Sequence, residues 1–131
     1  MSVEDLKKSQ MMNHMLEALE SGEDIGHYGR LTFAMIARHF VDNDELVQLL
    51  TKDHDADEQE VRAMVQQVEE KRYNPPNRDK ILEWQSKQDF QICPNPDDPD
   101  ACNVYGELDI PQGVLEDIQE YRAEEQVARD S

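Results

Sequence analysis

Apolar residues spaced three and four positions apart recur along most of the chain and predict a series of helices. Over 2–20, Ser2 followed by Asp5 is a helix-start signature, and the apolar stripe consists of Leu6, Met12, Met15, Leu16 and Leu19. The segment "SGEDIG" contains Gly22 and Gly26 and predicts a break. The pattern then predicts a second helix over 28–41. It is apolar around most of its circumference, which is typical of a helix in the centre of a bundle.

Capping signals divide the middle of the chain into shorter helices. Asp42 with Glu45 precedes the apolar segment "ELVQLL", and Asp55 with Glu58 precedes a helical stripe of Val61, Met64, Val65 and Val68. The segment "YNPPN" at 73–77 predicts the end of that helix, because proline and the residue before it disfavour the α conformation. A further helix is predicted over 78–88, around Ile81, Leu82 and Trp84.

The positions of the prolines predict a loop and then a helix in the last third of the chain. The segment "CPNPDDPDACN" has three prolines in eleven residues and predicts a long proline-rich loop. Pro111, a favourable first-turn residue, starts a last predicted helix through Val114, Leu115, Ile118 and Tyr121. The only place for a short strand is near 103–108. The pattern predicts an all-α fold, with a single compact multi-helix domain over 1–122 and an acidic tail, 123–131, that frays.

Charge adds a strong constraint to this pattern. The chain has 131 residues, the size of one domain, and carries 30 Asp and Glu against 13 Lys and Arg, a formal net charge of −17. Two interpretations stay open: an ordinary, well-solvated acidic surface, or a halophilic protein from a cell where molar salt screens repulsion within about 3 Å. Such a charge opposes nucleic-acid binding in dilute buffer. High salt screens this repulsion, but it also weakens every attractive contact with phosphate.

The sequence offers little for a membrane, a metal or a cofactor. No apolar run approaches membrane-spanning length, and the N-terminus lacks the apolar core of a signal peptide, so we expect a cytoplasmic protein. Cys93 and Cys102 are separated by eight residues, which is neither a zinc-knuckle spacing nor a disulfide framework. The nearby aspartates do not fit a calcium loop of the EF-hand type. We expect two ordinary cysteines, no metal and no cofactor.

Basic residues gather in one apolar stretch, "DIGHYGRLTFAMIARHF" at 24–40. On a helix, Arg30, Ala34 and Arg38 share a face, and His27 lies at or just before the helix start. The N-terminus of a helix presents free N–H groups and a partial positive charge. His27, Arg30 and Arg38 are therefore a candidate phosphate site. Spacing alone favours the alternative, in which both arginines pair with the abundant carboxylates.

A second basic group surrounds an aromatic residue in "EEKRYNPPNR". Lys71, Arg72 and Arg78 flank Tyr73, and such basic-aromatic patches can contact a nucleic-acid backbone. The alternative is a surface turn with counter-charges. The chain has no G-x-S-x-G, HExxH or glycine-rich phosphate loop, and no nucleophile–base set stands out. We therefore expect a protein that is not an enzyme.

Several of these segments, in this order, resemble the C-terminal domain of the large subunit of archaeal and eukaryotic DNA primase. They are the stretch "MMNHMLEALESGEDIGHYGRLTF" from Met11, the basic residue Arg38 on the following apolar helix, "YNPPNRDKI", and the C-P step in "ICPNP" at Cys93. The resemblance covers roughly 11–105. The family domain binds a four-iron cluster through four cysteines, but here Met11 and Arg78 stand at the first two ligand positions. Neither residue type replaces a thiolate in such clusters, so we expect none.

The resemblance implies a noncatalytic module of DNA replication, similar to a small cluster-free primase subunit found in some archaea. It implies that His27, Arg30 and Arg38 bind a nucleotide 5′-triphosphate and that the domain also contacts template nucleic acid. The implied partner is the primase catalytic subunit. A second hypothesis comes from another class: a small acidic helical adaptor that binds a protein and no nucleic acid. The surroundings of Arg30 and Arg38 distinguish the two hypotheses. Carboxylate pairing of both arginines favours the adaptor, and an open concavity that both share with His27 favours the nucleotide site.

Overall fold

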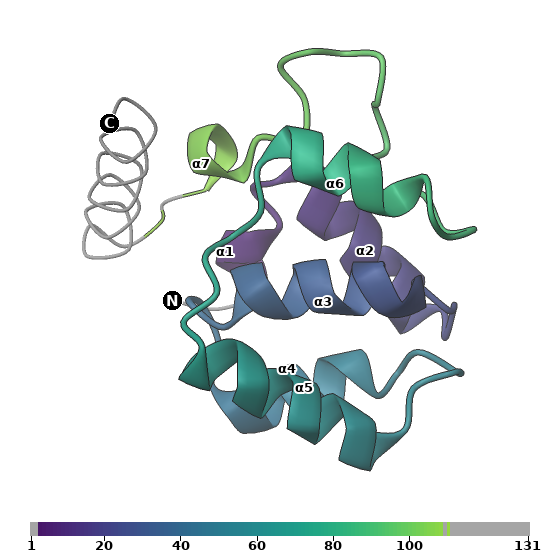
Figure 1. Ribbon diagram of the computed structural model, residues 1–131, viewed down its shortest axis with the longest axis vertical. Coiled ribbons are helices and arrows are strands. Elements are labelled where there is room, and N and C mark those ends of the chain that lie inside the picture. Colours follow the sequence, from purple (N-terminus) through teal and green to yellow (C-terminus); the bar gives the residue numbers. More distant parts are fainter. Residues whose placement is uncertain (1–2, 109, 111–131) are drawn as a thin grey trace, which may run out of the picture.

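The computed structural model describes residues 3–108 and 110, and within them it contains seven helices and no strand (Figure 1). The helices are α1 (Val3–Leu6), α2 (Gln10–Glu20), α3 (Gly26–Ala37), α4 (Asn43–Leu50), α5 (Glu58–Glu70), α6 (Arg78–Gln85) and α7 (Val104–Glu107). The predicted all-α fold is confirmed. The short strand suggested near 103–108 is wrong, because this segment closes its hydrogen bonds locally: the Leu108 N–H donates to the Val104 carbonyl at 3.0 Å.

The single helix predicted over 2–20 is split in two. α1 ends at Leu6, and α2 begins after Ser9, whose side chain is buried and whose Oγ accepts a hydrogen bond from the Met12 N–H at 3.2 Å. A serine at this position caps a new helix rather than continuing the old one, because its hydroxyl competes with the backbone for the free N–H groups. The apolar stripe runs across the break, so spacing alone did not reveal it.

α3 lies at the centre of the bundle, as its apolar circumference predicts, and it packs against α2, α4, α5 and α6 (Figure 1). It begins two residues earlier than expected and ends at Ala37. Gly26 adopts a positive φ of 78°, and a Cβ at this position would overlap the side chain of Gln88. The Gln88 side chain lies against Gly26 because it makes two hydrogen bonds to the backbone at the start of α3. Its Oε1 accepts from the Tyr28 N–H, and its Nε2 donates to the Ile25 carbonyl, both at 2.9 Å. The segment after α6 therefore fixes where α3 starts.

The caps of the next helices agree only in part with the sequence signals. Asp42 caps α4 as predicted, accepting from the Glu45 N–H at 2.8 Å. The cap of α5 is Asp57, which accepts from the Gln59 N–H at 2.9 Å, and not the predicted Asp55. Asn77 caps α6. The helix predicted over 78–88 is three residues too long at its end, since α6 stops at Gln85.

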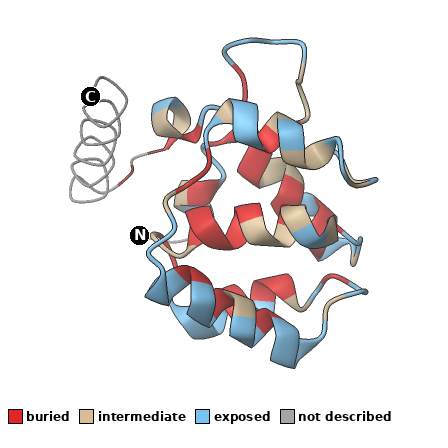
Figure 2. Cartoon of the chain, in the orientation of Figure 1, coloured by how far each residue is buried: buried red, intermediate tan, exposed pale blue. Residues whose placement is uncertain are grey.

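The core forms where α2, α3 and α4 turn their buried sides toward one another (Figure 2). α3 contributes a continuous buried run over 32–37, and its Phe33 and Ile36 are fully buried. No helix in the described part of the chain is long and apolar enough to cross a membrane. The predicted helix from Pro111 through Tyr121, the end of the predicted domain at 122 and the predicted frayed tail, 123–131, lie outside the described residues.

Candidate binding groove and its basic ends

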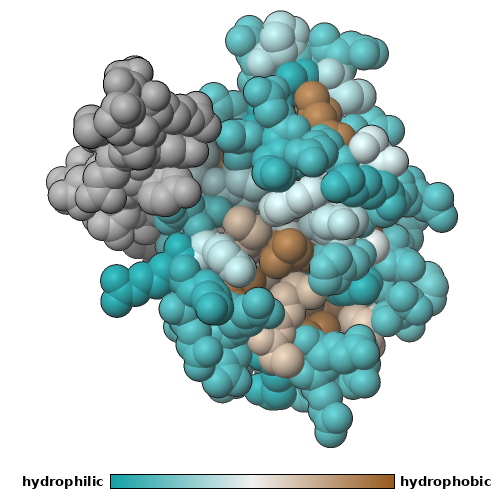
Figure 3. All heavy atoms as spheres, in the orientation of Figure 1, coloured by the Kyte–Doolittle hydropathy of each residue, from teal (hydrophilic) through white to brown (hydrophobic). Residues whose placement is uncertain are grey.

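A groove of about 660 Å³ runs along the outer side of α3. Its apolar lining is Leu31 and Met35 from α3, Val61, Met64 and Val68 from α5, and Trp84 from α6. Figure 3 shows apolar residues gathered in the middle of this face, surrounded by hydrophilic surface. We call this feature the α3 groove. Its volume lies within the usual range for ligand sites, 300–1,000 Å³, in which apolar walls carry a few polar groups.

The two long walls of the α3 groove run in the same direction. Near the start of α3, Arg30 contacts Asp53, which precedes α5. Near its end, Arg38 donates to the carbonyl of Tyr73, which follows α5. The groove therefore has a first end, where α3 and α5 begin, and a second end, where both helices stop. His27 and Arg30 line the first end together with Asp57 and Glu60.

Arg30 is held by two carboxylates at the first end. Its Nη1 lies 3.0 Å from Asp53 Oδ2 and 3.2 Å from Asp24 Oδ1. The side chain of Asp53 is fully buried, and that of Arg30 is only 13% exposed. The arginine therefore neutralises a buried charge of the protein. Arg30 thus shows the carboxylate pairing expected of the adaptor, and it also lines the cavity together with His27, as the nucleotide site requires.

The N-terminus of α3, predicted to offer N–H groups to a phosphate, already donates to side chains. The Ile25 N–H donates to Asp53 and the Gly26 N–H to Asp24, both at 2.8 Å, and the Tyr28 N–H donates to Gln88 at 2.9 Å. The imidazole of His27 is exposed and meets the Tyr28 ring edge-on at 5.3 Å between centroids. An anion at this end would have to compete with ligands that the protein supplies itself.

Arg38 lies at the second end, apart from His27 and Arg30. Eight residues of helix separate it from Arg30 by about 12 Å along the axis, and the two guanidinium groups contact different segments of the chain, Asp53 for Arg30 and Tyr73 for Arg38. The Nη2 of Arg38 lies 3.3 Å from the Tyr73 carbonyl, and its Nε is buried without a hydrogen-bond partner. The pKa of Arg38 is lowered by burial and by the charge of Arg72, while Glu69 acts against the shift.

The second end thus brings together residues from two separate basic segments of the sequence. Arg38 comes from the predicted triphosphate site, and Lys71, Arg72 and Tyr73 from the predicted nucleic-acid patch. We call Arg38 and Arg72 the basic corner. Tyr73, which is 39% exposed, lies beside it and lines the α3 groove. The fourth residue of the predicted patch, Arg78, lies elsewhere.

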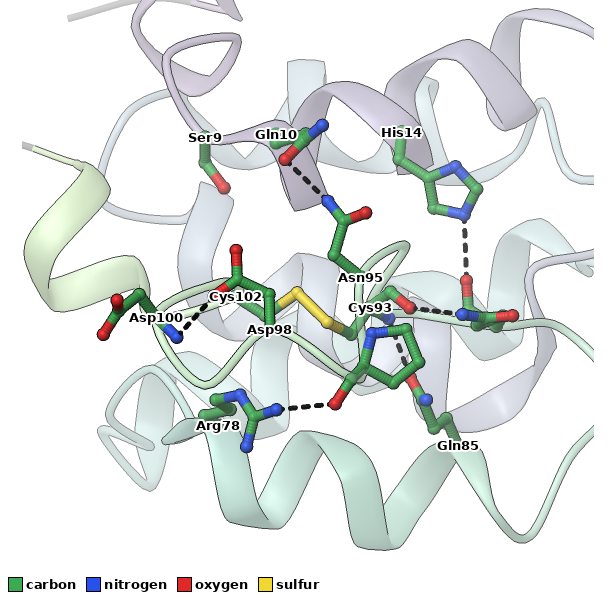
Figure 4. The surroundings of a disulfide bond; sticks show 12 residues. Ser9, Gln10, His14, Arg78, Gln85, Cys93, Asn95, Asp98, Asp100 and Cys102 are labelled. Carbon is green, nitrogen blue, oxygen red and sulfur yellow. Dashed lines mark hydrogen bonds between the residues drawn. A yellow bond between two sulfur atoms is a disulfide. The ribbon is translucent and has the colours of Figure 1, made fainter.

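Arg78 supports the loop that follows α6 and does not reach the basic corner. Its Nη2 donates to the Pro96 carbonyl at 2.7 Å (Figure 4). This loop contains a disulfide between Cys93 and Cys102, whose Cα atoms are 5.8 Å apart. The expectation of two ordinary cysteines is wrong, because the turns between them bring the two side chains together in the buried base of the loop. Within residues 3–108 and 110, no group of three His, Cys, Asp or Glu side chains could hold a metal ion.

No family model, curated protein or solved structure matches this chain. The geometry also contains residues that sequence reasoning missed. Asp53 sits in the acidic run "TKDHDADEQE", where nothing distinguishes a buried carboxylate from its exposed neighbours. Gln88 follows the last turn of α6 and gives no pattern signal. Met64 and Trp84 were recognised as apolar helix positions, and the arrangement of α5 and α6 around α3 makes them groove walls.

Proposed function

We propose that this protein is a noncatalytic adaptor whose α3 groove binds an amphipathic helix of a partner protein. The observation that carries the proposal is an apolar groove on an otherwise hydrophilic surface (Figure 3). Contiguous apolar surface of this kind is typical of interaction sites, and a helix laid into a groove is a recurring mode of recognition. The carboxylate pairing of Arg30 supports an adaptor, since this arginine is engaged inside the protein.

The walls of the groove suit a helix. α5 and α6 pack on different sides of α3 (Figure 1). Leu31 and the largely buried Met35 of α3 line the cavity that these helices border. Helices pack with their axes about 8–10 Å apart, so a partner helix lying in the groove would pack against α3 between α5 and α6. Met35 and Met64 add unbranched, adaptable side chains that can adjust to the apolar residues of the partner.

The charges at the ends of the groove define the chemistry of the partner. Asp57 and Glu60 line the first end, whereas Arg38 and Arg72 form the basic corner at the second end. A complementary helix carries basic residues over Asp57 and Glu60 and acidic residues over the basic corner. Charges at such exposed positions set the register and the association rate more than the affinity. The apolar stripe of the partner supplies most of the binding free energy.

The test uses the single tryptophan of the chain, Trp84, which lines the groove. The probe is a designed peptide of about 14 residues, roughly 20 Å as a helix, with a leucine stripe, glutamates in one half and lysines in the other. We expect a saturable change in Trp84 fluorescence with this peptide and none with a scrambled peptide of the same composition. Equal responses to both peptides would contradict the proposal.

A pair of variants on α5 localises the binding. Met64→Glu places a charge on the apolar wall and should weaken peptide binding at least tenfold, because a buried unpaired charge is strongly unfavourable. Gln66→Glu adds the same charge at an exposed position outside the groove lining and should leave binding within about twofold, since exposed charges contribute little. Equal binding by the two variants would place the peptide somewhere other than the α3 groove.

We propose nucleotide binding as a second candidate, because His27 and Arg30 line the same cavity as Trp84. In this primase-related hypothesis, a 5′-triphosphate is bound by His27, Arg30 and Arg38. The template nucleic acid contacts Lys71, Arg72 and Tyr73, and the partner protein is a primase catalytic subunit. Titration of ATP and of a 5′-triphosphate duplex, at low and molar potassium chloride, tests it. Binding that weakens at least tenfold in Arg38→Gln supports this candidate, and no binding at any salt concentration removes it.

A further inference from the structure

We infer that a small cavity beside the second end of the α3 groove binds one aromatic side chain of the partner helix, carried among the acidic residues of that helix. The inference rests on the proposed adaptor function and deepens it by assigning an anchor residue to the partner. It draws on three observations: the position of the cavity, the side chains that line it, and the charges around it.

The cavity has a volume of about 270 Å³ and adjoins the α3 groove, since Met35 and Trp84 line both. We call it the anchor cavity. Its other walls come from the connection between α5 and α6 and from Tyr105 of α7. This connection begins at the second end of the groove, where α5 stops. A helix lying in the α3 groove is therefore within side-chain reach of the anchor cavity at that end.

The lining of the anchor cavity suits an aromatic ring. It includes the rings of Trp84 and Tyr105 and those of the buried Pro75 and Pro76. The hydroxyl of Tyr105 donates to the Pro75 carbonyl, which ties two of these walls together. The volume is below the usual range for ligand sites, so the cavity fits one side chain rather than a helix. Aromatic pairs gain more than their buried area alone provides, and aromatic residues in pockets often dominate an interface.

Basic side chains lie around the anchor cavity. Lys80 lines it directly, and the basic corner of Arg38 and Arg72 lies at the same end of the groove. The carboxylate nearest to Lys80 is that of Glu83, at 3.2 Å, and Glu83 also pairs with Lys87 at 3.7 Å, so two lysines share it. Acidic residues next to the anchor residue complement these cations. The anchor therefore belongs to the acidic half of the partner helix.

The experiment compares versions of the designed leucine-stripe peptide by the change that they cause in Trp84 fluorescence. The first carries phenylalanine in the outermost turn of its glutamate half, and the second carries alanine at that position. The third carries phenylalanine in the outermost turn of its lysine half. We expect the first to bind the full-length protein about tenfold or more tightly than the second, because burial of a phenylalanine side chain contributes about that factor. The third should bind like the second, since the anchor cavity lies at the other end of the groove.

Two variants of the protein locate the anchor residue. Asn74→Phe places a ring at a position that lines the anchor cavity, and Tyr105→Ala removes one of its walls. Neither residue lines the α3 groove. Both variants should bind the alanine peptide as the wild type does and bind the phenylalanine peptide no better. The matched control, Asn13→Phe on α2, lies outside the lining of both cavities and should keep the full preference for phenylalanine.

The outcomes separate this inference from the adaptor proposal. If the wild type binds the phenylalanine and alanine peptides equally, the anchor is wrong and the adaptor proposal stands. A preference for phenylalanine that survives in both Asn74→Phe and Tyr105→Ala would place the ring elsewhere and also overturn the inference. Equal binding of a leucine peptide and the phenylalanine peptide would contradict the choice of an aromatic residue. If no peptide of the series binds, the adaptor proposal fails, and the anchor fails with it.

Discussion

Arg30 Nη1 lies 3.0 Å from Asp53 Oδ2, and this contact joins the second turn of α3, near its start, to the connection between α4 and α5. The Asp53 carboxylate also accepts two backbone hydrogen bonds. The same oxygen accepts from the Ile25 N–H at the start of α3, and its other oxygen accepts from the Asp55 N–H, each at 2.8 Å. The carboxylate is therefore buried together with one cation and two N–H donors. This arrangement gives Arg30 a structural role whatever else the groove binds.

Loss of Arg30 should destabilise the fold. Arg30→Met leaves the buried carboxylate of Asp53 without its cation, and breaking a buried pair in this way costs about 3 kcal/mol. The matched control is Arg62→Met, which removes an arginine that pairs with Glu58 and Asp44 at the surface, with 54% of its side chain exposed. We expect the control to lie within about 0.5 kcal/mol of the wild type. Urea unfolding measures both, and equal losses would contradict the structural role.

The disulfide between Cys93 and Cys102 should stabilise the fold by closing a short loop, with a sequence separation of 9. A loop of this size corresponds to about 2.5 kcal/mol in the chain-entropy description. The double variant Cys93→Ala/Cys102→Ala should lose about that much in urea unfolding. Dithiothreitol should lower the stability of the wild type toward that of the variant and leave the variant unchanged. If dithiothreitol does not change the stability of the wild type, and both cysteines react as free thiols once the protein is unfolded, the disulfide does not form.

His39 should make the fold less stable in mild acid. Burial and the neighbouring charge of Arg38 lower the pKa of His39 to about 4, and its Nε2 is buried without a hydrogen-bond partner. The unfolded chain takes up this proton near pH 6.5, whereas the folded protein resists it down to about pH 4. The contribution of His39 to stability is therefore unchanged above pH 6.5 and falls as the pH drops from 6.5 to about 4.

The test compares the wild type with His39→Gln, because every carboxylate titration is common to both proteins. Urea midpoints measured at pH 7.5, 6, 5 and 4.5 should fall more steeply for the wild type than for the variant over this window. Parallel curves would mean that His39 takes up its proton equally readily in the folded and unfolded states.

Salt should raise the thermal stability of the protein. A formal net charge of −17 on 131 residues opposes compaction by self-repulsion. Potassium chloride screens this repulsion, with a screening length near 10 Å at about 0.1 M and near 3 Å at about 1 M. We expect the unfolding temperature to climb steadily over this range, whereas sucrose at equal osmolality should give a smaller rise. A flat or falling temperature in salt would remove the argument for a halophilic protein.

The sequence by itself determined the helical class and most of the helices, because both depend on local patterns. Apolar spacing marked α2, α3, α5 and α6, and Asp42 with Glu45 located the start of α4. The sequence pattern located a helix correctly where a capping signal and an apolar stripe began together. It failed where they conflicted, as at Ser9, where the hydroxyl caps a helix inside a continuous stripe. It also failed at α7, where the weak pattern allowed a strand.

Only the tertiary structure decided which residues share a site, because pairing joins positions far apart in the chain. Arg30 and Arg38 fall near one helical face, yet one contacts Asp53 and the other Tyr73. No local pattern marks Asp53 among so many carboxylates, since burial alone distinguishes it. The cysteines met because the turns between them bend the loop back. The α3 groove exists because α5 and α6 flank α3 without covering it, which is a property of helix packing and not of any one helix.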